Sequence, residues 1–232
     1  MVKPGRATGA RTRSREDYLK ALHALAPAGE TVTTSQLAAR LGVSAPSVTS
    51  MLRLLAREKM IVYEKRGGAR LAPAGRRRAL EMVRRHRILE TFLQNVLGLD
   101  WAEVHEDAEV LEHHISDRVL EAIDRRLGHP SEDPHGHAIP DREGRMPERT
   151  LAPLASLGAG ARATVREIRD DDRARMAGWK RAGLVPGAEV RVRAVRDLED
   201  VFEIEVGGRK LVSGSEGLEG VLVEPHARKR SA

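Results

Sequence analysis

A helix–turn–helix pattern at residues 33–60 constrains the fold of this chain more than any other feature of its sequence. Residues 33–41 (TTSQLAARL) have the apolar spacing of a short amphipathic helix, Gly42 interrupts it, and Ser44 is placed to cap a second, longer helix. Apolar residues recur along the second segment at helical spacing, and we expect them in the core: Val48, Met51, Leu52 and Leu55. Two helices joined by a glycine-centred turn are typical of this motif.

A β-hairpin is predicted directly after the second helix. Residues 60–72 (MIVYEKRGGARLA) read as a strand, a Gly-Gly turn and a second strand. Lys65, Arg66 and Arg70 surround the tip of this hairpin. A basic hairpin in this position is typical of the wing of a winged helix–turn–helix domain.

The N-terminal residues predict a first helix that follows a disordered arm. Ser14 is placed to cap a helix at residues 14–25, and Asp17 stands three residues on, as in a capping box. Residues 1–13 are basic and lack the apolar segment of a secretory signal, so we expect them to be disordered. With the hairpin, the winged domain is predicted to span residues 14–75.

Short polar side chains and one arginine predict a DNA-binding face on the second helix. We assign this face and the hairpin tip to double-stranded DNA, through Ser44, Pro46, Ser47, Ser50, Arg53, Lys65, Arg66 and Arg70. Hydroxyls and arginine suit base edges in a major groove, and basic wing residues suit phosphates. The net charge of +6 favours an anionic partner, although GC-rich coding also favours arginine. The alternative is an ordinary solvated face of a helical hairpin.

Residues 103–118 (EVHEDAEVLEHHISDR) concentrate potential metal ligands. On a helix, His105, Glu109, Glu112 and His113 fall at i, i+4, i+7 and i+8, which is one face. Two imidazoles and two carboxylates suit Mn, Fe(II), Co or Zn. The chain has no cysteine, which excludes thiolate ligands and disulfides. The alternative is a solvated, charged helix face.

Residues 76–128 are predicted to be helical and to hold a dimer interface. A long helix at residues 74–97 contains His86 and Glu90, four residues apart and therefore on one face. With a further helix at residues 116–127, this region has more aliphatic surface than a winged domain needs to cover itself. The surplus predicts a homodimer.

Residues 129–150 are rich in proline and glycine and predict a linker. His129, His135 and His137 fall in this polar segment. We expect these three histidines to be solvated rather than bound to a metal.

The C-terminal part of the chain changes from helical to strand-like. Strand-like runs separated by turns such as Gly207-Gly208 occur at residues 161–167, 189–196, 201–206, 210–212 and 220–223. With a short helix at residues 171–182, they predict a small β-barrel at residues 151–226, before a basic tail at residues 227–232. The predicted fold class is therefore mainly α with β.

The order of these parts resembles the metal-dependent repressor family, which includes the diphtheria toxin repressor, the iron-dependent regulators and the manganese transport regulators. The resemblance runs from about residue 15 to residue 225. Its most specific motifs are S-R-E-D-Y-L around Asp17, R-R-H-R-I-L-E up to Glu90 and H-E-D-A-E-V-L-E-H-H-I-S-D from His105. It implies a winged helix–turn–helix, a helical dimerisation domain and an SH3-like or FeoA-like barrel. It also implies a homodimer that binds palindromic operators when loaded with metal and represses metal uptake.

The resemblance also implies two sets of metal ligands. The principal set is Asp17, Glu109, Glu112 and His113. The second set is His86, Glu90, His105 and an acid of the barrel, Asp172 or, less securely, Asp171. Arg175 stands at the barrel's other usual ligand position, a departure from the family pattern.

Carboxylates at two of the principal positions predict the metal. Iron sensors of the family have Met and Cys where this chain has Asp17 and Glu109, and manganese sensors have carboxylates there. Exchanging soft for hard donors favours Mn(II), with Fe(II) as the alternative and Co(II), Zn(II) or Cd(II) as substitutes. Manganese sensors often carry a further acid where this chain has Lys20, which argues against a close two-metal cluster.

Ligands from two domains give the predicted metal a physical role. Asp17 belongs to the predicted DNA-binding domain, and Glu112 and His113 belong to the dimerisation domain. An ion that joins them would fix the spacing of the two recognition helices in a dimer, which must meet major grooves about 34 Å apart. By linkage, metal and DNA would then raise each other's affinity equally.

Two other function classes compete with this prediction. Di-iron carboxylate oxidases also use Glu and His, but they need a Glu-x-x-His pair on each of two helices, and only one comparable cluster occurs here. We therefore predict no enzyme activity. The other alternative is a DNA-binding regulator that metal does not control. No apolar run approaches 18 residues, so we expect no membrane span and a cytoplasmic location.

Overall fold

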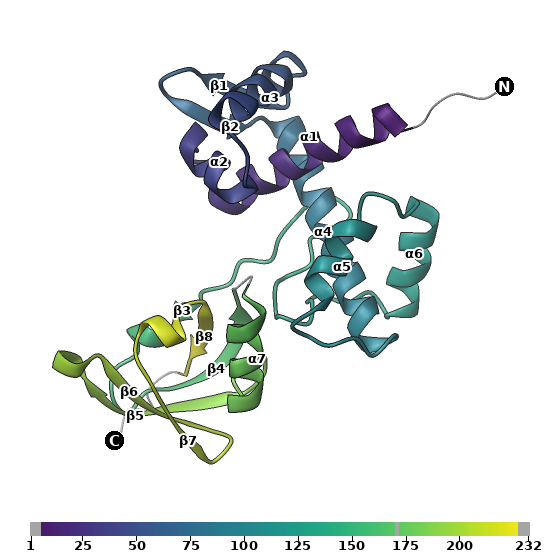
Figure 1. Cartoon of the computed structure of the whole chain (residues 1–232). Coiled ribbons are helices and arrows are strands. Elements are labelled where there is room, and N and C mark those ends of the chain that lie inside the picture. Colours follow the sequence, from purple (N-terminus) through teal and green to yellow (C-terminus); the bar gives the residue numbers. More distant parts are fainter. Residues whose placement is uncertain (1–5, 170–171, 227–232) are drawn as a thin grey trace. The chain divides into compact units, whose positions relative to one another are not determined.

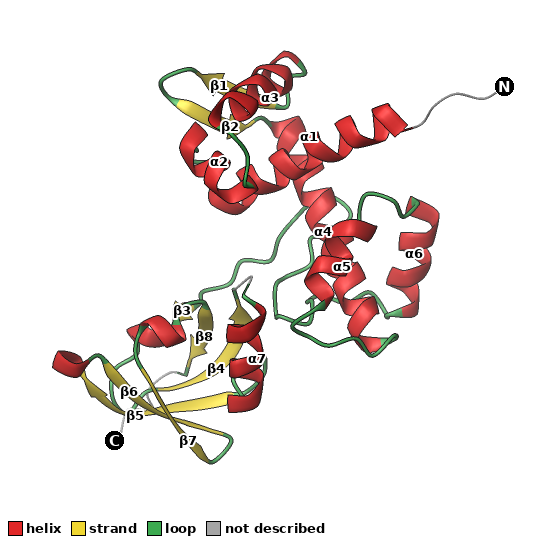
Figure 2. Cartoon of the chain, in the orientation of Figure 1, coloured by secondary structure: helices red, strands yellow, loops and turns green. Residues whose placement is uncertain are grey.

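The computed structural model describes residues 6–169 and 172–226, without the side chains of residues 6–13 and of Asp197. The chain divides into two compact units. Unit 1 holds the chain up to residue 86 with the later segments 111–115 and 140–146, and unit 2 holds the rest. Figure 1 follows the elements along the chain, and Figure 2 separates helices from strands.

The first helix, α1 (Arg6–Leu25), begins earlier than the sequence predicted. Ser14 lies inside the helix, so the predicted cap at Ser14 and its capping box with Asp17 are wrong. The disordered state predicted for residues 6–13 is also wrong. Alanine and arginine have high helix propensity and continue the helix through Gly9. The predicted arm's residues 1–5 lie outside the described residues.

The two helices of the predicted helix–turn–helix are confirmed as α2 (Thr34–Leu41) and α3 (Ala45–Arg57). Thr33 caps α2 in a capping box: its hydroxyl accepts from the Gln36 N–H, and the Gln36 side chain accepts from the Thr33 N–H. The hydroxyl of Ser44 accepts from the Ser47 N–H and caps α3, as predicted. Fully buried apolar residues hold the two helices together: Leu37, Val48, Leu52 and Leu55.

The predicted wing is confirmed as the antiparallel strands β1 (Ile61–Glu64) and β2 (Gly68–Leu71). The Val32 N–H donates to the Ala69 carbonyl at 2.8 Å, and the Ala69 N–H donates back at the same distance. This bridge ties the wing to the segment that leads into α2.

Three more helices follow the wing: α4 (Pro73–Asn95), α5 (Val104–Leu111) and α6 (Asp117–Arg126). The helix predicted at residues 116–127 is confirmed as α6, but the ligand-rich helix expected before it is shorter than predicted, because α5 ends at Leu111 and a turn follows. The N–H groups of residues 114 and 115 both donate to the Leu111 carbonyl, and Ser116 caps α6. No helix in the described part of the chain is long and apolar enough to cross a membrane.

The C-terminal part forms a six-stranded antiparallel sheet with one helix, in agreement with the predicted SH3-like domain. Its elements are β3 (Ala152–Pro153), β4 (Arg162–Ile168), α7 (Arg173–Ala182), β5 (Glu189–Arg196), β6 (Val201–Val206), β7 (Arg209–Ser213) and β8 (Val221–Pro225). The strand order is β3-β8-β4-β5-β6-β7. Burial alternates along β6, where Phe202, Ile204 and Val206 face the core. Strand β3 was not predicted.

The segment predicted as a linker is partly built into unit 2. Asp133 and His135 are buried, so the prediction that all three histidines are solvated is wrong for His135. The Ile168 N–H of β4 donates to the His135 carbonyl at 2.9 Å, and the Gly136 backbone closely approaches β4. His129 is exposed, as predicted.

Candidate metal centre

Residues from two segments of unit 1, helix α1 and the turn after α5, meet around the imidazole of His113. Its Nδ1 atom lies 2.8 Å from Glu16 Oε2. Its Nε2 atom lies 2.9 Å from Asp17 Oδ1 and 3.5 Å from Glu112 Oε1, yet it is buried and forms no aligned hydrogen bond. A buried ring nitrogen within 3.5 Å of two carboxylate oxygens has the arrangement expected around a cation.

The acids around His113 change its protonation. Burial lowers the pKa of His113, but Asp17 and Glu16, with Glu112, outweigh burial and raise this pKa to about 9. Without a metal, the imidazole is therefore protonated at neutral pH and neutralises part of the acidic charge.

Glu112 is the most enclosed acid of this cluster, with 1% of its surface exposed. Lys20 Nζ lies 2.7 Å from its Oε1, and His86 Nδ1 lies 2.6 Å from its Oε2. The Arg85 Nε–H donates to the Glu112 backbone carbonyl at 3.0 Å. A buried carboxylate needs such positive partners, and a bound cation can replace them.

Sequence reasoning missed the role of Glu16. This buried acid holds His113 Nδ1 and also pairs with Arg78. Burial raises its pKa, but His113 and Arg78 outweigh burial and lower it. Glu16 thereby orients His113 with Nε2 toward Asp17, as carboxylates behind ligating histidines do in metal sites. Its position next to Asp17 was the only signal in the sequence.

The principal set is brought together in part within unit 1. One potential ligand atom from each of Asp17, Glu112 and His113 lies within 4.8 Å of each of the others. Glu109 is in the last turn of α5, where its carboxylate lies 3.7 Å from His105 Nε2. The donors are oxygens and nitrogens only, a set that suits a hard or borderline divalent cation.

The second predicted set has members in both units. In unit 2, His105 Nδ1 lies 3.0 Å from Glu90 Oε1, and in unit 1, His86 Nδ1 lies 2.6 Å from Glu112 Oε2. Asp172 caps α7, where its carboxylate accepts from the N–H groups of residues 174 and 175. Asp171 lies outside the described residues.

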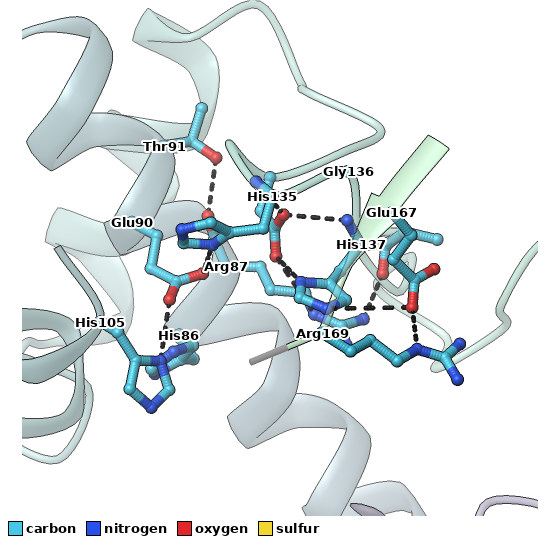
Figure 3. Close-up of polar contacts among 12 residues, drawn as sticks. His86, Arg87, Glu90, Thr91, His105, His135, Gly136, His137, Glu167 and Arg169 are labelled. Atoms are coloured by element: carbon cyan, nitrogen blue, oxygen red, sulfur yellow. Dashed lines mark hydrogen bonds and ion pairs between the residues drawn. The ribbon is translucent and has the colours of Figure 1, made fainter. Parts of the chain in front are cut away.

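A different acidic and histidine cluster lies next to Glu90 in unit 2 (Figure 3). Asp133, His135 and His137 each place a potential ligand atom within 4.8 Å of the others. His135 Nδ1 lies 3.8 Å from Glu90 Oε2, and His137 Nε2 lies 3.8 Å from Glu167 Oε1 on β4. The sequence signal for it was the turn motif Asp-Pro-His-Gly at residues 133–136, which arranges side chains locally.

The surroundings of His135 leave one nitrogen available as a ligand. Its Nε2 atom lies 2.9 Å from the Trp101 carbonyl, which can only accept, so Nε2 carries the proton. Nδ1 then faces Glu90. Burial lowers the pKa of His135, but Glu90 and Asp133 outweigh burial and raise it. A carbonyl behind the far nitrogen is a common feature of histidines that bind metals.

The predicted DNA face is exposed as expected. The side chains assigned to DNA are all exposed: Ser44, Pro46, Ser47, Ser50, Arg53, Lys65, Arg66 and Arg70. Ser44 also caps α3, and its hydroxyl lies 2.9 Å from that of Ser47. Within the described residues, no acidic side chain pairs with Arg53 or with the three basic residues of the wing. These four charges are therefore available to an anionic partner.

Three family models match successive parts of the chain. Residues 11–69 match the model described as "Iron dependent repressor, N-terminal DNA binding domain", and residues 72–141 match "Iron dependent repressor, metal binding and dimerisation domain". Residues 152–225 match "FeoA domain".

Individual relatives extend the similarity over most of the chain. The iron-dependent repressor IdeR of Mycobacterium tuberculosis is 30% identical over 189 residues, which are 76% of this chain and 82% of IdeR. The HTH-type transcriptional regulator MntR of Listeria monocytogenes is 32% identical over 123 residues, 51% of this chain and 86% of MntR. A solved manganese-dependent transcriptional repressor in complex with manganese has a TM-score of 0.85 and 36% identity, covering 91% of this chain and 100% of that one.

Proposed function

We propose, from the premise that this chain belongs to the metal-dependent repressor family, that it is a homodimeric Mn(II) sensor that binds operator DNA when loaded with metal. Members of the family are transcriptional repressors, so this chain is a metal-dependent DNA-binding regulator and not an enzyme. The choice of metal, its ligands and the operator are the parts that we propose.

The arrangement around His113 carries this proposal. We assign the principal site to Asp17, Glu112 and His113, with Glu109 as the fourth ligand because the family resemblance places a ligand at this position. The buried Nε2 atom of His113, within 3.5 Å of oxygens from two carboxylates, is the supporting observation. A divalent cation supplies positive charge that lets these carboxylates lie close together, so the imidazole does not have to be protonated.

The ligands would couple metal binding to DNA binding through α1. Asp17 lies on α1, which packs against the helix–turn–helix through Leu19 and Leu22. Holding Asp17 beside His113 fixes α1 on the turn that follows α5. The recognition helix α3 then has one orientation before it meets DNA, so the protein loses less conformational entropy when it binds. A coupling free energy of about 1–3 kcal/mol gives a switch of about 5–150-fold.

The chemistry of the donors favours Mn(II). Three carboxylates and one imidazole are hard or borderline ligands, and the chain has no cysteine to supply a thiolate. Such a site lacks the soft donors that increase the preference for later transition metals. Fe(II) is the nearest competitor, since it accepts the same ligands.

We assign a second ion to the cluster of Glu90, Asp133, His135 and His137. Asp133 and Glu90 are buried, with 6% and 2% of their surfaces exposed, and both need positive partners. This cluster shares Glu90 with the second set predicted from the sequence. It places the second ion between the dimerisation domain and β4, where Glu167 approaches His137.

Exposed apolar residues of unit 2 support a dimer. They are Val96, Leu97, Leu99, Val110 and Val119, each at least 39% exposed. They lie on or beside α4, α5 and α6, in the region that matches the family's dimerisation domain. Exposed apolar side chains gathered in one region are typical of a protein–protein interface.

DNA binding measured against metal tests this proposal. The operator is first selected from a random duplex library with Mn(II)-loaded protein, and fluorescence anisotropy then gives its Kd with Mn(II), Fe(II), Co(II), Zn(II) or no metal. We expect Mn(II) to lower the Kd at least about fivefold. Asp17→Asn should abolish this effect of metal while the protein stays folded. Equal operator affinity with and without metal would instead identify a regulator that metal does not control.

A further inference from the structure

A cationic cavity of about 610 Å³ lies on the C-terminal domain. The end of α7, the turn between β6 and β7, and the first residues of β4 and β5 form its walls. Its basic lining residues are Arg162, Lys180, Arg181, Arg191, Arg209 and His226. None of them belongs to the proposed metal or DNA sites, so the function proposed above does not explain their accumulation.

The sheet places two of these arginines side by side. Arg162 on β4 is directly opposite Arg191 on β5 in the antiparallel register. Side chains at such positions have Cβ atoms about 4.5–5.5 Å apart, and like charges there destabilise the pair. An anion between the two guanidinium groups would remove this repulsion.

The acid opposite Arg191 in the sheet pairs with a different arginine. Glu205 is opposite Arg191 on the other side, in β6, but its Oε2 accepts from the Arg193 Nε–H at 2.6 Å. Lys180 already pairs with Asp100 at 3.0 Å. The charges of Glu205 and Lys180 are therefore both satisfied elsewhere.

The remaining guanidinium groups have no acidic partner within the residues that the structure describes. These groups belong to Arg162, Arg181, Arg191 and Arg209, and Glu189 is the one other carboxylate in the lining. The Nε atom of Arg191 is buried and has no hydrogen-bond partner. Nearly all buried donors in proteins are satisfied, so this one indicates a missing acceptor.

We propose that this cavity binds a small anion that carries two or more phosphate groups. Guanidinium groups bind phosphate oxygens with two parallel N–H···O bonds, and four of them match more than one phosphate. The volume is within the range of small-molecule sites. The lining contains no Phe, Tyr or Trp on which a base could stack, so the phosphates themselves are the recognised part.

Duplex DNA is the competing anion, and the cavity favours the small ligand. Its walls come from three separate parts of the domain, which makes it a recess rather than an extended stripe. Arginines that track along an open groove are the usual arrangement for nucleic acid.

Calorimetric titration of the full-length, metal-free protein with tripolyphosphate tests the proposal. Omitting divalent ions keeps the probe unchelated and keeps this test independent of the metal site. We expect saturable binding that Arg191→Gln weakens about tenfold or more, since it removes charge-assisted hydrogen bonds. Arg209→Gln, on the exposed hairpin, should weaken it as well without disturbing the core. Arg196→Gln removes the same charge from the other end of β5 and should change the Kd less than about twofold.

Three results would overturn the proposal. The first is the absence of saturable binding to the unaltered protein. The second is equal weakening by Arg191→Gln and Arg196→Gln, which indicates diffuse attraction instead of a site. The third is that duplex DNA of unrelated sequence displaces tripolyphosphate, and that Arg191→Gln weakens DNA binding as much as it weakens tripolyphosphate binding. That result would assign the surface to the DNA backbone. Thermal unfolding provides an independent readout: tripolyphosphate should raise the Tm of the unaltered protein but not that of Arg191→Gln.

Discussion

The Nε2 atom of His113 lies 2.9 Å from Oδ1 of Asp17, although these residues are far apart in the sequence. One belongs to α1 and the other to the turn after α5. In the metal-free protein, the protonated imidazole neutralises the acids that surround it. A divalent cation offers more charge but needs a neutral imidazole. A proton and a metal ion therefore compete for the same place.

This competition predicts that metal binding releases a proton. The pKa of His113 is raised to about 9, so the imidazole is protonated at pH 7 and must lose its proton to become a ligand. We expect release of about one proton per principal site at pH 7, and a rise in metal affinity of about tenfold per pH unit up to pH 9. Titration calorimetry in buffers with different heats of ionisation measures the released protons. His113→Gln should bind metal weakly and release none from this site.

The same shift predicts how the stability of the metal-free protein depends on pH. The pKa of His113 is higher in the folded protein than its ordinary value of 6.5, so the stabilisation is complete below pH 6.5 and is lost as pH rises through about 9. The free energy of unfolding should fall between these values, and His113→Gln should remove that part of the fall. Urea unfolding at several pH values measures it. An identical pH dependence in the variant would contradict the assigned pKa.

Lys20 should weaken metal binding, because its ammonium group already neutralises a proposed ligand. Its Nζ atom lies 2.7 Å from Glu112 Oε1, and the side chain is 19% exposed. Lys20→Met removes this competing cation, and we expect metal affinity to rise by up to about tenfold. Metal titration by calorimetry measures the change. Lys210→Met, which removes an exposed charge paired with Glu203, is the control. Unchanged affinity in Lys20→Met would show that this ammonium does not compete with the ion.

Local patterns account for what the sequence predicted correctly. Strands β5 and β6 were predicted to the residue because period-two alternation and flanking turns define them. The end of α5 at Leu111 was missed, since residues 112–115 continue the helical spacing. The next helix was predicted from Ser116, and Ser116 does cap it.

Long-range contacts account for most of what the sequence did not predict in the candidate sites. The pairing of Glu16 with His113 joins residues that no local pattern relates. The burial of His135 depends on Trp101 and on β4, far away in the sequence. Composition alone made its segment resemble a linker. Family resemblance supplied the principal ligand set, and for the second set it named Glu90 and His105, whose side chains meet in unit 2.

The second ion is predicted to need His135. Two Mn(II) ions per chain are expected by equilibrium dialysis, and His135→Ala should reduce the number to one, because Nδ1 of this imidazole faces the buried Glu90. His129→Ala is the matched control: His129 pairs with Asp124, and its side chain is 62% exposed. It should leave two ions bound. Loss of both ions in His135→Ala would contradict two independent sites.

A glycine in the same segment should control whether the second cluster assembles. Gly136 has φ +84°, and a Cβ atom there would lie 1.8 Å from the Arg166 carbonyl. Gly136→Ala must therefore push the segment off β4 and break the bond between the Ile168 N–H and the His135 carbonyl. We expect a loss of about 2 kcal/mol or more in the free energy of unfolding, together with the second ion.

A comparison of Gly136 with Gly128 separates the effect of backbone strain from that of steric exclusion. Gly128 has a similar φ of +74°, but nothing lies within 4 Å of an added Cβ atom. Gly128→Ala therefore carries the left-handed strain alone, which should cost about 1 kcal/mol and leave both ions bound. Chemical unfolding and equilibrium dialysis on the two variants make the comparison. If Gly136→Ala retained the second ion, the contact of this segment with β4 would not be needed to hold His135 and His137 in place.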